Sequence, residues 1–316
     1  MPMKRLLIPF KIFLSLACLY WAITHLDFYS TKKLFYSQNG LLAFGLGILM
    51  AGVQTTLGSI RFATLLKNAS YPIRFWEAMQ IAFIGGFFSQ AAFSMVSGDA
   101  MRIWFLVQSK LTLKRATYFI MIDRGLGLLA LLLLSLGCIP FLLQMPFIPN
   151  LPRILIGLTI IGLLSIFVLY FAFKRWGYKI QNTWVFELLS FNKQIFSRSF
   201  QSNTLIVLLS LFIHLCNVIA IYLFMKCFGV PIGFIECAIV MLPTMLMVML
   251  PISVGGWGVR ESLLIFGFGF FGVPAETALT VSILWGLALL VSLLPGSFLF
   301  LLGRSGGWTR RSTPTT

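Results

Sequence analysis

The stretch MLPISVGGWGVRESLLIF, residues 249–266, interrupts a long apolar sequence with a proline, three glycines and two adjacent charges. Pro251 ends a helix, because its ring clashes with the preceding turn and its nitrogen has no hydrogen to donate. The glycines that follow allow an unwound or closely packed backbone; they are Gly255, Gly256 and Gly258. Arg260 and Glu261 then open the next helix. The stretch therefore predicts a broken helix with a charged tip.

The sequence on both sides of this break is too apolar for a soluble protein. Apolar residues make up 59% of the 316 residues, charged residues only 10%, and the mean hydropathy is +0.95. Soluble domains carry about a quarter charged residues. We expect an all-α protein, a polytopic transmembrane helix bundle that forms one membrane domain over residues 1–303. A disordered basic tail over residues 304–316 is expected to follow it.

Apolar segments near the roughly 20 residues that cross a bilayer recur along the chain. They lie at 6–26, 41–66, 76–97, 116–143, 154–173, 204–226, 234–251, 257–273 and 277–302. A full crossing at 76–97 would translocate the basic residues Arg102, Lys110, Lys114 and Arg115, against the positive-inside rule. We therefore expect 76 to about 110 to be a re-entrant hairpin from the cytoplasmic side and 234–273 to be one from the outer side.

This topology places both termini in the cytoplasm of a cell with the chain in its plasma membrane, which we take to be a bacterial inner membrane. It counts Arg61 and Arg102 among the cytoplasmic basic residues and leaves Arg124 and Arg260 at membrane depth. With the two expected hairpins, this topology gives two units at 41–143 and 204–302. Each unit consists of a span, a hairpin and a second span. Such inverted repeats are a recurring transporter plan, although any row of apolar helices can be paired in this way. The link at 174–203 suits an amphipathic helix on the cytoplasmic leaflet or a plain connector.

The net charge of +16 does not indicate nucleic-acid binding, because the basic residues gather at the ends of apolar segments. Membrane lipids are the expected partners, with lipid-synthesis enzymes as possible further ones.

The five cysteines include no CxxC pair, and His25 and His214 lie far apart, so we predict no metal, no cofactor and no catalytic residue. The oligomeric state does not follow from the sequence.

Charges inside a bilayer are costly, about 2.5–3.5 kcal/mol at a helix centre, so each needs a partner or a purpose. Asp99 and Arg102 would share a helix face and could pair. Asp123 and Arg124 are adjacent and point to different faces, so each needs a partner elsewhere. The economical pairings are Asp123 with Arg102 or Asp99 with Arg124.

Arg260 and Glu261 at the start of a broken helix allow two interpretations. A half-helix N-terminus beside a buried arginine suits a phosphate headgroup. Alternatively, the two residues form a structural ion pair that locks the hairpin tip. The candidate substrate-binding residues are Arg260, Glu261, Gly255, Gly256, Asp99, Arg102, Asp123 and Arg124.

Four motifs in order resemble one known family. They are FFSQ at 87–90, SGDAMR at 97–102, IDRGLGLLALL at 122–132 and LPISVGGWGVRE at 250–261. The chain is similar to the lysylphosphatidylglycerol synthase transmembrane-region family, also called flippase-like membrane proteins. Members usually show Asn, Pro and Gly where this chain has Ser89, Phe93 and Ser97. The resemblance implies lipid translocation or lipid handling, by a stand-alone member without the soluble synthase domain.

The leading hypothesis is a flippase-like transporter of an anionic lipid, in which the two hairpin tips meet at mid-membrane. The chain has no GxxxxGK[ST] loop for a nucleotide, so any drive comes from a gradient, a coupled proton or mass action. The alternatives are an intramembrane headgroup or glycosyl transferase, with Asp99 or Glu261 as the base, and a non-transporting scaffold of a lipid-synthesis complex. No metal site or nucleophile with a paired histidine supports the enzyme.

Overall fold

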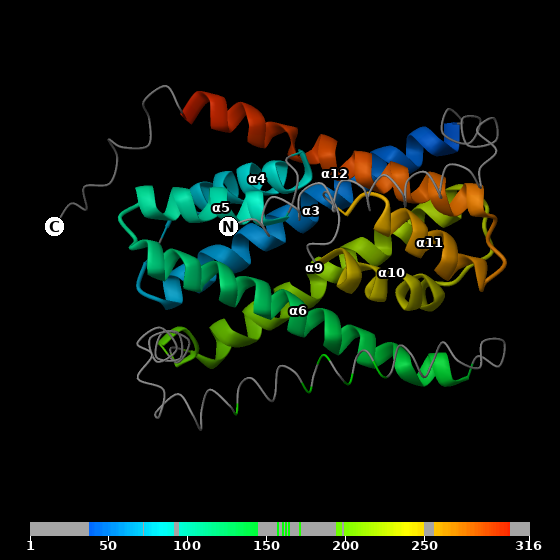
Figure 1. The fold of residues 1–316 in the computed structure, drawn as a ribbon, viewed down its shortest axis with the longest axis horizontal. Helices are drawn as coiled ribbons and strands as arrows, with labels where there is room; N and C mark the ends of the chain where they lie inside the picture. The colour runs from blue at the N-terminus through cyan, green and yellow to red at the C-terminus, as the bar shows by residue number, and fades with distance from the viewer. Residues whose placement is uncertain are drawn as a thin grey trace, which may run out of the picture.

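The computed structural model describes residues 38–71, 73–91, 95–144, 194–197, 199–249 and 256–303, with isolated residues at 157, 160, 162, 164 and 171. Helices make up the secondary structure of this part of the chain, which confirms the all-α prediction. Their bounds are α3 Gln38–Asn68, α4 Phe75–Ala91, α5 Met95–Gln108, α6 Leu113–Leu143, α9 Phe200–Cys227, α10 Phe234–Met249, α11 Val259–Gly269 and α12 Ala275–Gly303 (Figure 1). The expected first span, most of the 154–173 segment, most of the 174–203 link and the tail lie outside the described residues.

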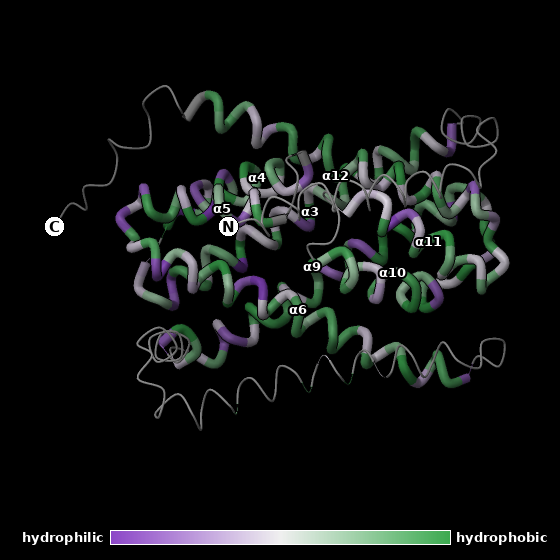
Figure 2. Tube along the Cα trace, in the orientation of Figure 1, coloured by the Kyte–Doolittle hydropathy of each residue, from purple (hydrophilic) through white to green (hydrophobic). Residues whose placement is uncertain are grey.

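Four of these helices, α3, α6, α9 and α12, are long and apolar enough to cross a membrane. At 1.5 Å per residue, about 20 residues already cover the hydrocarbon core of a bilayer. Their outer faces carry exposed large apolar side chains, for example Leu41, Leu133, Phe212 and Phe298. Apolar residues dominate the tube of Figure 2 along the whole length of the bundle. The protein is a multi-pass helical membrane protein.

The helices follow one order twice along the chain. A long helix, two short helices and a long helix form α3 to α6, and the same order recurs in α9 to α12. The short helices pack pairwise, α4 on α5 and α10 on α11. Both pairs coincide with the segments expected to be hairpins, 76 to about 110 and 234–273. Among the described residues, the positive φ angles of Gly256 (84°) and Gly258 (83°) allow the turn that leads into α11.

Two apolar cores lie toward opposite ends of the α3 and α9 pair, which has the most extensive contact between described helices. One core is formed chiefly by α3, α9, α10, α11 and α12, around Trp285, Phe224 and Phe268. The other is formed by α3, α4, α5 and α6, around Phe119 and Ile84. Since α3 contributes to both cores, it is the scaffold on which the two groups of helices are assembled.

The link between the two groups differs from its predicted bounds at one end. Residues 200–203 were assigned to the 174–203 segment, but they form the first turn of α9. This helix begins at Phe200, and the polar residues that follow are part of it. Ile195, a few residues earlier, is fully buried in the core with Phe62 and Phe119. This end of the link therefore packs into the protein.

Gly47 determines how closely α3 approaches α9. A Cβ atom added at Gly47 would lie 2.6 Å from Cζ of the buried Phe224 and 3.0 Å from Cβ of Ala288, whereas one added at Gly52 would meet no atom within 4 Å. We predict that Gly47→Ala lowers the free energy of unfolding by about 1–3 kcal/mol through overpacking. Gly52→Ala, in the same helix, is the matched control and should leave the Tm of the purified protein unchanged. Equal Tm values for the two variants would contradict the close packing at Gly47.

Candidate functional site

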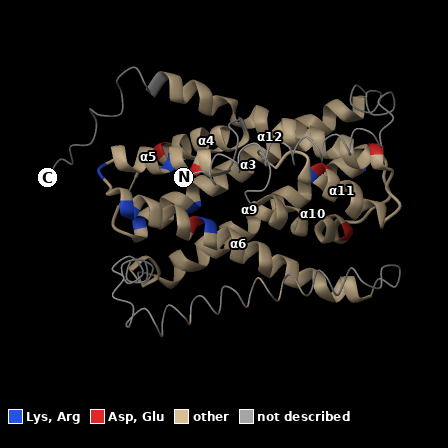
Figure 3. Cartoon of the chain, viewed as in Figure 1, with Lys and Arg blue, Asp and Glu red and all other residues tan. Residues whose placement is uncertain are grey.

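The charged residues of the helix interior form two groups. The central cluster comprises Arg61, Asp99, Arg102, Asp123 and Arg124, and joins α3, α5 and α6. The α11 cluster comprises Trp257, Arg260, Glu261 and Ser282, at the start of α11 and on α12. Figure 3 shows the charged pair of α11 as a patch separate from the charges on α5 and α6.

Arg61 and Asp123 form the inner salt bridge of the central cluster. Arg61 Nη2 lies 2.8 Å from Asp123 Oδ1, and Arg61 Nε donates to the same oxygen at 3.0 Å. Arg61 Nη1 also donates to Ser210 Oγ at 3.1 Å, which connects the pair to α9. Both charged residues are buried. Arg61, which sequence analysis counted among the cytoplasmic basic residues, is thus paired with a carboxylate in the interior of the bundle.

Asp99 and Arg124 form the outer salt bridge. Arg124 Nη2 donates to Asp99 Oδ1 at 2.6 Å, and its Nε atom lies 3.1 Å and 3.0 Å from the two carboxylate oxygens. The prediction that Asp99 pairs with Arg124 is confirmed. The two side chains are 22% and 29% exposed, so this pair lies closer to the surface than the inner one.

Arg102 is held more loosely than the other two arginines. Its Nη1 atom lies 3.7 Å from Asp123 Oδ2, which confirms the predicted pairing with Asp123 but exceeds hydrogen-bond distance. Its Nε atom is buried and has no hydrogen-bond partner in the described structure. Gly85 of α4 accommodates the side chain, since a Cβ there would lie 2.5 Å from Arg102 Nε. Arg102, also counted among the cytoplasmic basic residues, lies on α5 and faces Asp123 of α6.

The glycine of the SGDAMR motif, Gly98, lies where α4 and α5 pack closely. A Cβ atom at Gly98 would lie 1.9 Å from Ser89 Oγ and 2.2 Å from the Gly85 carbonyl oxygen of α4. Ser97 Oγ donates to the Phe88 carbonyl at 2.7 Å. Small residues at this contact allow α4 and α5 to approach closely, as is usual in membrane helix pairs. This contact places Arg102 and Asp99 against α6.

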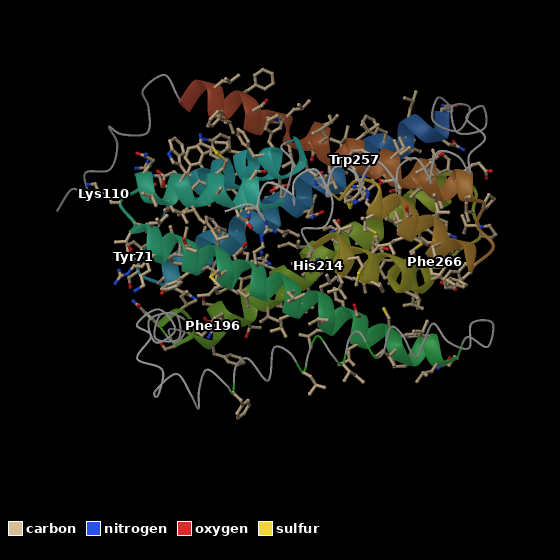
Figure 4. The ribbon with its side chains drawn as sticks, in the orientation of Figure 1. Tyr71, Lys110, Phe196, His214, Trp257 and Phe266 are labelled. Carbon is tan, nitrogen blue, oxygen red and sulfur yellow. The ribbon has the colours of Figure 1, made fainter. Side chains whose placement is uncertain are left out.

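His214 completes the polar interior. Its Nε2 atom lies 2.9 Å from the carbonyl oxygen of Gly127 on α6, within hydrogen-bond distance. Figure 4 places it near the middle of the bundle. Ser210 and His214 lie one turn apart on α9, so both face the region where Arg61 meets α6. Sequence analysis assigned no role to either residue.

The α11 cluster forms a closed set of contacts. Arg260 Nη2 lies 2.8 Å from Glu261 Oε1, and Ser282 Oγ donates to the same oxygen at 2.9 Å. The other oxygen of Glu261 accepts from the Gly258 backbone N–H at 2.6 Å, which caps the start of α11. The Arg260 guanidinium lies 4.9 Å from the ring centre of Trp257. Arg260 and Glu261 are 4% and 2% exposed, so the contacts favour the structural ion pair over an open anion site.

Helix α12 is fitted to this pair. A Cβ atom at Gly286 would lie 2.3 Å from Arg260 Nη2 and 2.8 Å from the Trp257 ring. Of the two glycines predicted in the tip, Gly256 is described and contacts Val248, while Gly255 lies outside the described residues. Among the described residues, no group of three or more His, Cys, Asp or Glu could hold a metal ion.

Comparison with known families gives one match over nearly the whole chain. The model of the lysylphosphatidylglycerol synthase TM region matches residues 8–296. The match includes both charge clusters, the long helices α3, α6 and α9, and α12 as far as residue 296. A search of curated proteins found no match.

The contacts of Asp123 predict which arginine depends on it most. Asp123→Asn should cost several kcal/mol, because it leaves Arg61 buried without its carboxylate. In double-mutant cycles of the unfolding free energy, Asp123→Asn should couple by more than about 1 kcal/mol to Arg61→Gln and by less to Arg102→Gln. The reason is the 2.8 Å contact to Arg61 against 3.7 Å to Arg102. Absence of coupling between Asp123→Asn and Arg61→Gln would show that the inner salt bridge does not form.

The α11 cluster predicts a stability effect. Glu261→Gln and Arg260→Met should each lower the Tm, with a cost of about 3–5 kcal/mol for the single loss of one partner. The double variant should cost less than the sum, because no unpaired charge remains. Thermal melts of the three purified variants test this. Unchanged melting of both single variants would exclude the structural ion pair.

Proposed function

The chain belongs to the lysylphosphatidylglycerol synthase TM-region family, and on this premise we propose that it is a flippase-like transporter that moves an anionic lipid between the two leaflets. The family links the chain to lipid handling in the membrane. The observation that carries the proposal is the central cluster, five charged side chains inside a bundle whose outer faces are apolar. Such groups are costly in a membrane unless they serve a polar substrate or one another.

The order of helices supports a transport mechanism. We propose that the two short-helix pairs are re-entrant hairpins and that the two groups, 41–143 and 204–302, are inverted repeats. In such a plan one repeat moves against the other and exposes a central site alternately to each side. Helix α12 suits this role because it packs against both α4 and α11. We propose one membrane domain in a bacterial inner membrane, with both termini in the cytoplasm.

A small apolar cleft lies between the two groups, with an accessible volume of about 20 Å³, enough for one water-sized group such as a methyl. Helices α6 and α10 line it, with Cys138, Ile139 and Leu142 from α6 and Ile239, Leu242 and Pro243 from α10. A lipid needs both a polar site for its headgroup and an apolar surface for its tails. The central cluster and this cleft both involve α6, so one long helix can contact both parts of a lipid.

The contacts of the carboxylates favour transport over an intramembrane transferase. Asp99 and Glu261, the two candidate bases, each accept hydrogen bonds from an arginine at 2.6 Å and 2.8 Å. A carboxylate whose oxygens are occupied by an arginine is not placed to take a proton from a substrate. We therefore propose that the protein is not an enzyme, and that membrane lipids are its partners.

Reconstitution tests the transport directly. The purified protein is placed in phosphatidylcholine liposomes with a trace of headgroup-labelled phosphatidylglycerol, and the label that becomes accessible from outside is followed over time. Liposomes with the wild type should expose the inner-leaflet label, and empty liposomes should not. The Gly52→Ala protein should match the wild type, and Arg102→Gln should be slower by about tenfold or more, because a charged hydrogen bond is worth about 1.5–3 kcal/mol. No exposure above empty liposomes would overturn the proposed transport.

A further inference from the structure

We propose that Arg102 binds a phosphate group and that Arg61 keeps Arg102 available by occupying Asp123. The proposal deepens the proposed function, on which it rests, because it names the charge and the chemical class of the group that the central cluster takes. It assigns two different roles within the cluster. Arg102 is the binding residue, and Arg61 is a positioning residue that acts through Asp123.

The central cluster has one surplus positive charge. Three arginines, Arg61, Arg102 and Arg124, face two aspartates, Asp99 and Asp123, so one positive charge remains without a carboxylate of its own. His214 does not supply the missing negative charge, because a histidine is neutral or positive. An uncompensated charge among apolar helices is strongly unfavourable. A bound anion would remove this cost.

The distances identify Arg102 as the arginine that carries the surplus. Arg124 is held by both oxygens of Asp99, at 2.6–3.1 Å, and Arg61 is held by Asp123 Oδ1 at 2.8 Å and 3.0 Å. Arg102 has only the 3.7 Å contact to the remaining oxygen of Asp123. Its side chain is 19% exposed, so it is desolvated without being closed off from a ligand.

The surroundings of Arg102 are polar and unsatisfied. Arg102 Nε and Ser89 Oγ are buried atoms without a hydrogen-bond partner in the described structure, and both can donate. On α4, Gly85 contacts Arg102, and Ser89, one helical turn further along, contacts Gly98 of α5. The serine hydroxyl and the guanidinium therefore share one face between α4 and α5. A phosphate group accepts several hydrogen bonds at once, and a guanidinium offers two parallel donors that fit it. These donors without a partner therefore match the acceptor oxygens of an oxyanion. Arg102 supplies the positive charge among them.

Arg61 makes this site possible by competition. Asp123 Oδ2 is already 3.7 Å from Arg102, and a small movement would form a direct salt bridge that neutralises Arg102. Arg61 prevents this movement, because it holds Oδ1 with two nitrogen atoms and is itself held by Ser210. Removal of Arg61 alone leaves two arginines for two aspartates. Asp123 would then pair with Arg102 and close the site.

Phosphate chemistry can come from a lipid headgroup or from a free phosphate ester, and the test separates them. The purified protein in detergent is melted with increasing dioctanoyl phosphatidylglycerol, and the rise in Tm gives the affinity. Dioctanoyl phosphatidylcholine has the same phosphate with an added positive charge, and glycerol phosphate has the phosphate without acyl chains. Wild type should bind phosphatidylglycerol at least tenfold more tightly than phosphatidylcholine. Glycerol phosphate binding as tightly as the lipid would assign the site to a free phosphate ester and overturn a headgroup site.

Four variants test the division of roles. Arg102→Gln and Arg61→Gln should each weaken phosphatidylglycerol binding about tenfold or more. Arg61→Gln/Asp123→Asn should restore it to within about threefold of the wild type, because Arg102 is free again. Arg102→Gln/Asp123→Asn has the same net charge as that double variant but lacks Arg102, and it should not bind. These fold-changes follow from the loss of one charged hydrogen bond.

Three outcomes with these variants would overturn the proposal. Wild-type affinity in a folded Arg61→Gln protein would exclude the competition for Asp123. Weak binding by a folded Arg61→Gln/Asp123→Asn protein would exclude it even if Arg61→Gln itself does not fold, since this double variant removes both members of the inner salt bridge and keeps the surplus charge on Arg102. Binding restored in Arg102→Gln/Asp123→Asn would show that net charge, and not Arg102, holds the anion. Because these are equilibrium measurements, they can succeed or fail independently of translocation by the wild type.

Discussion

The salt bridge between Arg61 and Asp123 connects the parts of this membrane protein that the chain order separates. It joins α3 to α6, and through Ser210 it extends to α9. A buried ion pair of this kind adds little net stability, but the loss of one partner is severe. The pair therefore acts as a constraint on how the helices are arranged. With Arg61 in place, Asp123 is held 3.7 Å from Arg102, whose own position is set by the close contact of α4 with α5.

The two charge clusters solve the same physical problem in different ways. In the α11 cluster each charge has a close partner, and Ser282, Trp257 and the Gly258 N–H complete the contacts. Nothing there requires a ligand. In the central cluster the arginines outnumber the aspartates, and the donors of Arg102 are incompletely used. A closed cluster suits the support of a helix end, whereas an open one suits a substrate that carries the opposite charge.

The sequence predicted the helical membrane fold because apolar length and charge placement are local properties. It also predicted the pairings of Asp99 with Arg124 and of Asp123 with Arg102, because unpaired charges on neighbouring spans leave few alternatives.

The sequence analysis did not identify Arg61 as a member of the cluster and assigned it to the cytoplasm, although it lies within the apolar segment 41–66. Apolar residues on both sides of Arg61 were the available signal. The contacts of Arg260 with Ser282 and Gly286 depend on how α12 packs, so the sequence left its two roles open.

A structure of the protein in lipid nanodiscs that contain phosphatidylglycerol, determined by electron cryomicroscopy, tests the central claim most directly. The claim is that the open cluster, and not the closed one, holds the anionic group. The account predicts headgroup phosphate density within hydrogen-bond distance of the Arg102 guanidinium, with Arg61 still on Asp123. A phosphate bound at Arg260, or Arg102 in a direct salt bridge with Asp123 and no lipid beside it, would contradict the account.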